Sequence, residues 1–156
     1  MGILPSILSN LETSETIVQT STDIPRGKTT FKFDFEKGDF VTDVLGNVIS
    51  TSDPAEVLEQ VVDKILHDTR YRYLAYPNYY GNEIQLILEQ DEPFEVIECE
   101  LKRLYEEALI YHPLIEGVSN FIAEMKGDEI RCEFDVTGTS GATIHRLEVV
   151  GQWKAA

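Results

Sequence analysis

Tyrosine and arginine side chains gather in one stretch of the sequence, "TRYRYLAYPNYYGNE" at residues 69–83. It holds two arginines and five of the seven tyrosines of the chain: Arg70, Tyr71, Arg72, Tyr73, Tyr76, Tyr79 and Tyr80. Aromatic rings that line a basic groove stack on single-stranded nucleic acid. Such rings also form sugar-binding surfaces, and Tyr and Arg are enriched anchors of protein interfaces. We expect some rings to pack against the core and others to face a partner.

The charge of the chain favours a protein partner over the other two. The sequence has 28 acidic and 13 basic residues, a formal net charge of -15. A surface of this sign repels phosphate and anionic lipid unless its basic residues cluster tightly. The sequence therefore predicts no nucleic-acid partner and no membrane partner. A sugar surface has no pair of catalytic acids to support it, so the tyrosine stretch is best interpreted as a protein interface.

Acidic residues could carry out glycoside hydrolysis, which needs two carboxyl groups roughly 5 to 9 Å apart. One of them must have a raised pKa, which requires an apolar pocket. The candidate acids lie in a predicted helix that should expose them to water: Glu92, Glu95, Glu98 and Glu106. Because acids are abundant in this helix, a cell-wall-degrading lysozyme is the alternative function.

Acids dominate from residue 83 to 107, which indicates either a solvated helix face or a docking face for a basic partner.

No other pattern points to catalysis. His67, His112 and His145 lie far apart and have no metal-like spacing to cysteines or acids. Phosphate-binding glycine motifs and the G-x-S-x-G motif are absent from the sequence. The sequence therefore predicts no catalytic residue, no cofactor and no metal.

The order of predicted elements indicates an α+β domain. Residues 1–29 are rich in Ser and Thr, and we expect an extended arm there, followed by a single domain over residues 30–156. The arm has an apolar set at helical spacing that could anchor on a neighbour, made of Ile3, Leu4, Ile7, Leu8 and Leu11. Phe31, Phe33 and Phe35 alternate with charged residues, which predicts a half-buried strand. A turn is expected at Gly46-Asn47.

Two to three helices should follow. Asp53 is a predicted N-cap with Pro54 at the first helical position, and this helix should end near Asp68. Its apolar stripe consists of Leu58, Val61, Val62, Ile65 and Leu66. A short helix is expected over residues 82–89. A third should run from about Asp91, with Pro93 in its first turn, to His112, because Pro113 disfavours helix in the residue before it.

The last forty residues predict a three-stranded antiparallel meander. "VSNFIAEM" and "EIRCEFDV" flank a compact turn at residues 126–128, and "TGTSG" leads into the third strand, "TIHRLEVV". Cys132 continues an apolar alternation and is interpreted as a small buried residue.

With these elements in order, residues 30–150 resemble the baseplate wedge proteins of contractile phage tails. The resemblance is to the branch found in Gram-positive phages and their defective, bacteriocin-like tail particles. It is carried by the order and spacing of "FKFDFEKGDF", "GNVI", "VVDKILHDTRYRYLAYPNYYG", "ELKRLYEEALIYHPLIEGV", "GVSNFIAEM" and "EIRCEFDV".

The resemblance implies where the protein meets its neighbours. Wedge proteins of T-even phages carry a loop with Gly, Arg and Pro before the second helix, and its place is taken here by Arg70, Arg72, Pro77, Tyr80 and Gly81. The wider family ends its long helix with a Glu-Pro-Arg signature that is implied to contact neighbouring wedge subunits. Here Pro113 matches, whereas the acid is replaced by His112 and the arginine by Leu114. An apolar contact through Leu114 would have to replace the charged one.

The resemblance also implies a structural role in a virion or phage-tail-like particle. Such proteins join the baseplate to the sheath in six copies, and their sheet accepts strands of the first sheath subunits, as an exposed edge can. The implied partners are other wedge subunits, the tail sheath protein, and tube or hub proteins. We expect sheath arms to pair with the strands of residues 129–150, at Arg131 and Glu133. With no signal peptide at its start, the chain is expected to be soluble and made in the bacterial cytoplasm.

Overall fold

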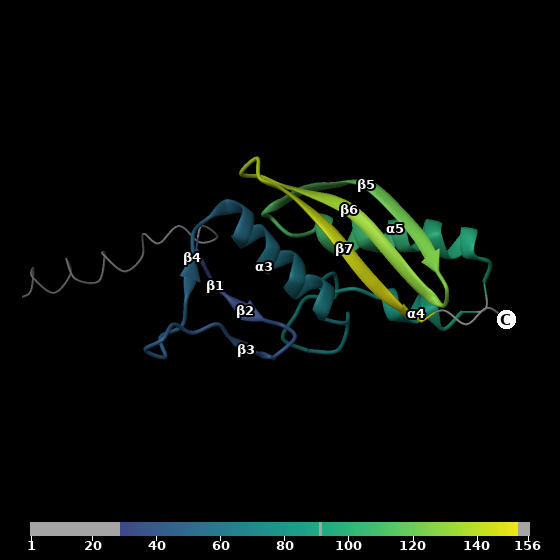
Figure 1. Cartoon of the computed structure of the whole chain (residues 1–156). Coiled ribbons are helices and arrows are strands. Elements are labelled where there is room, and N and C mark those ends of the chain that lie inside the picture. The colour runs from purple at the N-terminus through teal and green to yellow at the C-terminus, as the bar shows by residue number, and fades with distance from the viewer. Residues whose placement is uncertain (1–28, 91, 153–156) are drawn as a thin grey trace, which may run out of the picture.

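The computed structural model describes residues 29–90 and 92–152. Its elements, in chain order (Figure 1), are β1 Thr30–Phe31, β2 Phe33–Asp34, β3 Asp39–Phe40, β4 Ser50–Thr51, α3 Pro54–His67, α4 Ile84–Leu88, α5 Phe94–Ile110, β5 Ile115–Lys126, β6 Glu129–Gly138 and β7 Thr143–Gln152. This arrangement confirms the α+β prediction. The arm predicted over residues 1–29 lies outside the described residues, apart from residue 29.

Helix α3 begins and ends where the sequence predicts. The Asp53 side chain accepts a hydrogen bond from the Glu56 amide, Pro54 is the first helical residue, and Asp68 is the C-cap. Leu58, Val62 and Ile65 are buried, so the apolar stripe faces the core as predicted. The Glu56 carboxylate does not complete a capping box, because it bonds to Lys32 and Thr51 instead. The helix start is thereby tied to the N-terminal strands.

Helix α4 confirms the short predicted helix, and α5 confirms the third with a later start. Pro93 is the N-cap of α5 rather than part of its first turn, and the predicted start at Asp91 lies outside the described residues. The helix ends at Ile110, three residues before Pro113. Its buried residues include Ile97, Leu101, Leu104 and Ala108, which recur at helical spacing and face the core.

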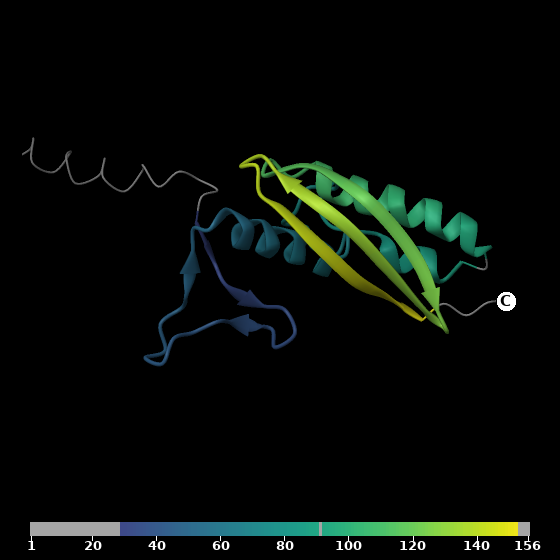
Figure 2. The same cartoon turned by 45° about the horizontal axis from the view of Figure 1, so that its top comes forward.

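The three long strands form an antiparallel sheet in the order β5-β6-β7, which confirms the predicted meander. Helices α3, α4 and α5 lie on one face of it, and Figure 2 shows no helix of the described residues on the other face. Phe134 on β6 is fully buried, and its ring lies 4.9 Å from that of Tyr105 on α5. Cys132 is also fully buried beside it, as predicted. The core therefore lies between the sheet and the helices.

The predicted strand at residues 31–35 is wrong in extent. It is broken at Lys32 into β1 and β2, which pair with different partners, β4 and β3. The partner changes at Lys32, whose amide donates to the Ile49 carbonyl next to β4 and whose carbonyl accepts from the Val41 amide next to β3. Phe31 is exposed, and its ring packs edge-on against that of Phe40. The turn at Gly46-Asn47 is confirmed, since Thr42 and Val48 bridge across it.

Candidate protein interfaces

The tyrosine stretch forms a loop between α3 and α4 that is closed at its neck. Thr69 bridges to Asn82, and the Arg70 amide donates to the Asn82 carbonyl at 2.9 Å. The buried Asn82 side-chain amide donates to the carbonyl oxygens of Leu66 and Asp68, at 2.7 and 3.1 Å. One side chain thus satisfies free carbonyls at the end of α3 and holds both ends of the loop together. The sequence patterns alone did not single out Asn82.

Gly81 is required at this neck for two reasons. Its φ of +90° lies in the region that L side chains rarely adopt. A Cβ at this position would also lie 2.7 Å from the carbonyl oxygen of Asp68 and 3.0 Å from the amide nitrogen of Arg70. The backbone geometry therefore explains why glycine occupies the last position of the tyrosine stretch before Asn82.

Arg70 stabilises the loop rather than facing a partner, which corrects its place in the predicted interface. Its side chain is 6% exposed, and its Nη1 lies 2.9 Å from Oε1 of Glu107 on α5 and 3.6 Å from Oε2 of Glu83. Its Nη2 donates to the Gly81 carbonyl at 3.3 Å. Arg72, two residues later, is exposed, and its guanidinium stacks at 5.6 Å over the Tyr73 ring. Only the second arginine is therefore free to contact a partner.

Four of the five loop tyrosines are exposed, and the fifth, Tyr80, packs against the core. Tyr71, Tyr73 and Tyr79 are 66%, 49% and 54% exposed. Tyr80 alone is half-buried, where burial and the nearby Asp68 carboxylate raise the pKa of its hydroxyl. The centre of the Tyr76 ring lies 4.6 Å from that of the Tyr80 ring, and the Lys64 ammonium lies over the Tyr76 ring. The rings are held by each other and by cations at the surface.

The loop meets the end of α5 around a small hollow of about 230 Å³. Pro77, Tyr79 and Tyr80 line it from one side, and Tyr111, His112 and Pro113 from the other. The rings of Tyr79 and Tyr111 lie 5.7 Å apart. Two segments that the sequence analysis predicted separately are therefore brought into one aromatic surface. We call Tyr71, Tyr73, Tyr76, Tyr79 and Tyr111 the tyrosine patch.

The surroundings of His112 in this hollow favour the uncharged imidazole. Burial lowers the pKa of its imidazole, and the positive charge of Lys64 lowers it further. The Leu114 amide donates to its Nδ1 at 3.2 Å, which a neutral ring accepts. At the position where the family signature implies an acid, this chain therefore has a histidine whose surroundings favour its uncharged form.

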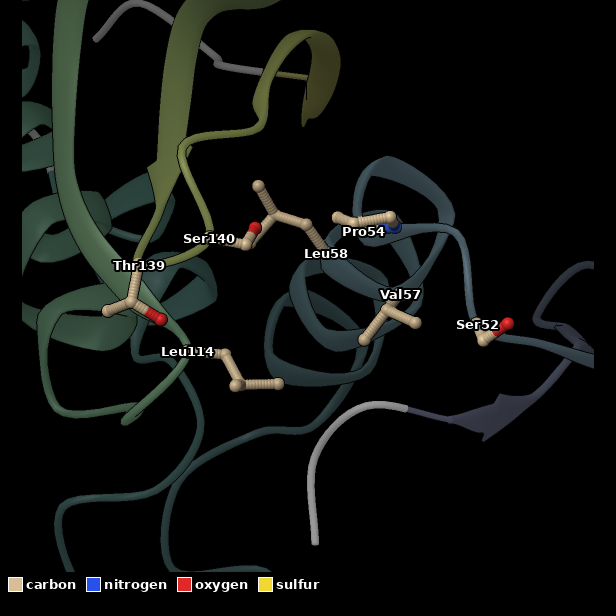
Figure 3. Close-up of a pocket in the computed structure, with 7 residues that line it drawn as sticks. All are labelled: Ser52, Pro54, Val57, Leu58, Leu114, Thr139 and Ser140. Atoms are coloured by element: carbon tan, nitrogen blue, oxygen red, sulfur yellow. The ribbon is translucent and has the colours of Figure 1, made fainter. Parts of the chain in front are cut away.

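Leu114 lines a second depression and not the hollow beside the patch. This groove, drawn in Figure 3, has a volume of about 360 Å³ and lies between the start of α3 and the turn that follows β6. Its lining is mainly apolar: Ser52, Pro54, Val57, Leu58, Leu114, Thr139 and Ser140. The sequence analysis missed this groove, because residues from three distant segments form it.

Arg131 and Glu133 do not offer their backbone to another strand, so this part of the prediction is wrong. They lie on β6, the central strand, where Arg131 pairs with both Glu124 and Val149. Glu133 pairs with Ile122 and Leu147 in the same way. A strand that is paired on both sides has no free hydrogen-bonding groups for a third. An incoming strand can reach only β5 or β7.

The two outer strands differ in regularity. β5 has two register shifts against β6, between Ile115 and Gly117 and between Ser119 and Ile122, and Asn120 has a φ of +53°. Bulges of this kind blunt an edge against strand addition. β7 instead pairs in unbroken register from Thr143 to Val149. Within the described residues, its other side has no paired strand.

The sequence of β7 contains a signal of this edge. Charged Arg146 and Glu148 lie on the helix side of the strand, where Arg146 bonds to Asp63 on α3 and to Glu148. Apolar Leu147 and Val149 are each 53% exposed on the open face. This inverted alternation, with charges inward, is typical of edge strands.

None of the four candidate acids is buried as a carboxyl of raised pKa would have to be. Glu92, which precedes α5, and Glu95 are exposed, and Glu98 and Glu106 are half-buried. Across residues 29–90 and 92–152, no cluster of three or more His, Cys, Asp or Glu could hold a metal ion. None of the helices in these ranges has the length and apolar character needed to span a membrane.

Comparison with known proteins identifies the family. Residues 29–141 match the family described as contractile injection system sheath initiator. The chain is also similar to the phage-like element PBSX protein XkdS of Bacillus subtilis (strain 168), with 30% identity over 154 residues, which cover 97% of this chain and 99% of that protein. Both matches confirm the resemblance that the order of the sequence segments indicated. The chain therefore belongs to the sheath initiators of contractile injection systems, a family of structural proteins of phage-type tails.

Proposed function

We propose that this protein is a baseplate wedge component that joins the baseplate to the sheath and starts sheath assembly. In this proposal a sheath subunit adds one strand to the free edge of β7, and the tyrosine patch packs on neighbouring baseplate subunits. The observation that carries the proposal is the regular, unpaired edge of β7 over residues 143–149 in a member of the sheath initiator family. Backbone pairing at an exposed edge supplies affinity without a fixed side-chain sequence.

The hydrogen-bond pattern indicates which backbone groups are free. The Gly138 amide donates to the Ala142 carbonyl at 2.8 Å, which makes these two residues a hydrogen-bonded pair. In an antiparallel ladder such pairs alternate with non-hydrogen-bonded ones. Along the β6–β7 register, the non-hydrogen-bonded positions of β7 are Thr143, His145, Leu147 and Val149. Their N–H and C=O groups point away from β6 and can pair with a fourth strand.

Open space beside β7 supports the proposal that a sheath strand adds to the β7 edge. A groove of about 510 Å³ lies between the N-terminal strands, α3 and β7, and Arg146 and Glu148 line its β7 side. Near the end of the strand, the Gln85 side chain reaches the Val150 carbonyl at 3.5 Å. The edge is therefore free before Val150 and covered near it, which limits an added strand to the regular stretch.

The tyrosine patch has the composition of an interface with a protein. Its exposed rings and Arg72 are residue types that dominate binding energy in protein complexes. The loop is closed by Asn82 and Arg70, so little conformational freedom is lost on binding. The baseplate partners proposed for it are other wedge subunits, with tube or hub proteins next to them.

The proposed role predicts which kind of particle forms when the protein is missing. Deleting its gene from a particle-producing strain should leave baseplates and tubes without a sheath, because strand addition has no template. Electron microscopy of purified particles measures the fraction with a sheath, and a plasmid copy of the intact gene is the control. Full-length sheaths in the deletion strain would refute the proposed role in initiation.

A second prediction concerns the tyrosine patch. The double substitution Tyr79→Ser with Tyr111→Ser removes two facing rings from the surface and should reduce co-purification with baseplate subunits at least about ten-fold, since a single anchor residue is often worth about 2 kcal/mol. The melting temperature of the free protein should change little, because both rings are exposed.

The matched control for the patch is Leu86→Ser. Leu86 lies on α4 and is exposed to a similar degree, at 56%. It should leave co-purification unchanged. Equal losses for the two variants would mean that the patch has no special role in docking.

A further inference from the structure

The groove in Figure 3 is an apolar surface that no described part of the chain fills. Pro54, Val57 and Leu58 form one wall at the start of α3, and Leu114 forms the other, while the turn at residues 139–140 closes one end. Its volume of about 360 Å³ is within the range of clefts, roughly 300 to 1,000 Å³, that bind ligands. An apolar occupant would remove the apolar lining of the groove from water, which is favourable.

We propose that the occupant is this chain's own N-terminal segment, residues 3–11, bound within the same molecule. The first reason is position. The described chain begins at residue 29, and Thr30 pairs with Thr51 across β1 and β4. Ser52, the next residue after Thr51, lines the groove. The described chain therefore begins one residue before a strand pair that adjoins the groove.

The second reason is reach. Residues 12–28 connect the segment to the domain, and an extended chain spans about 3.3 Å per residue, or about 55 Å for this connection. That length is ample for the segment to return to the groove of its own molecule. A tether of this kind gives an effective concentration in about the millimolar range, so even a weak apolar contact is occupied.

The third reason is complementarity. Ile3, Leu4, Ile7, Leu8 and Leu11 recur at helical spacing and form one apolar stripe. Residues 1–11 contain no Asp, Glu, Lys, Arg or His in a chain whose net charge is -15. The segment is therefore suited to an uncharged groove and suffers no side-chain charge repulsion on approach. Its docking shields the groove from water in the free protein.

Cysteine cross-linking in the full-length chain tests the proposal. Leu8→Cys and Ser140→Cys, on a Cys99→Ser background, place one thiol on the stripe and one at the groove, while Cys132 is fully buried. Under mild oxidation at low protein concentration, we expect an intramolecular disulfide, detected by mass spectrometry of the monomer. The matched control, Ser9→Cys with Ser140→Cys, places the first thiol off the stripe and should react at least about ten-fold more slowly, since only the stripe faces the groove.

Two further variants make the result specific to the groove. Leu114→Asp in the groove and Ile7→Asp in the segment should each slow the Leu8 cross-link to the control rate, because a charge cannot enter an apolar contact. The Ile7 variant lies outside the domain and so cannot act by unfolding it. Equal rates for Leu8 and Ser9, an unchanged rate in the Ile7 variant, or a covalent dimer as the main product would each overturn the proposal. A dimer would assign the groove to the segment of a second copy.

Discussion

Replacing Leu147 by proline is expected to prevent sheath assembly on the baseplate while the isolated protein stays folded. Leu147 lies in the middle of the regular β7 edge, and its pairing with Glu133 falls on a non-hydrogen-bonded position. Its N–H therefore points to the free edge. Proline removes this donor, and its ring takes the space that the incoming strand must occupy.

The size of the effect follows from one lost backbone hydrogen bond and a steric clash. The hydrogen bond alone contributes about 1 kcal/mol, and the clash adds to it, so we expect sheathed particles to fall about ten-fold or more. Proline is tolerated at an edge position whose N–H faces solvent. The free energy of unfolding should change by about 1 kcal/mol, which corresponds to about 2 to 4 °C in melting temperature. Complementation of the deletion strain followed by electron microscopy measures the first quantity.

Three comparisons isolate the backbone of β7 as the cause. Leu147→Ala keeps the N–H and should assemble sheaths, which separates the backbone from the side chain. Met125→Pro places the same ring on β5, the bulged edge, and should also assemble sheaths. Arg131→Pro should unfold the protein, because β6 is paired on both sides. A block by Met125→Pro and none by Leu147→Pro would assign the docking edge to β5.

The features that could be predicted from the sequence are those set by neighbouring residues. The cap at Asp53 and the stripe of Leu58, Val62 and Ile65 depend on contacts within a few residues, and both are found as predicted. The family follows from the order of such segments along the chain. The predicted strand at residues 31–35 was wrong in extent, because the Lys32 backbone bonds to both Ile49 and Val41 and the strand changes partner there. A local alternation of side chains does not reveal these distant partners.

The exposure of individual interface residues depends on contacts distant in the chain. Nothing in the alternation of arginine and tyrosine distinguishes Arg70 from Arg72, because the distinction arises from Glu107, 37 residues later. The position of the free edge depends on the order of three strands, so Arg131 and Glu133 were placed at it incorrectly. The inverted alternation of Arg146 and Leu147 was the local sign that β7 lies at the edge.

The two loop arginines should therefore behave differently when each is replaced by alanine. Arg70→Ala removes a buried guanidinium and leaves the carboxylates of Glu107 and Glu83 without it at the neck of the loop. Breaking a buried ion pair typically costs about 3 to 5 kcal/mol. Both acids are about 30% exposed here, and Glu107 keeps Arg103 as a partner, so we expect the lower end, about 3 kcal/mol.

This loss should lower the melting temperature of the free protein by about 6 to 12 °C, at about 2 to 4 °C for each kcal/mol. Arg72→Ala, which removes only an exposed contact with the Tyr73 ring, should change it by less than about 2 °C but should weaken baseplate co-purification. Thermal unfolding followed by circular dichroism measures the first effect, and affinity purification the second. Because the two residues are identical in type and two positions apart, the comparison controls for charge and for local sequence. Equal melting temperatures for the two variants would show that the Arg70 ion pair does not hold the loop in place.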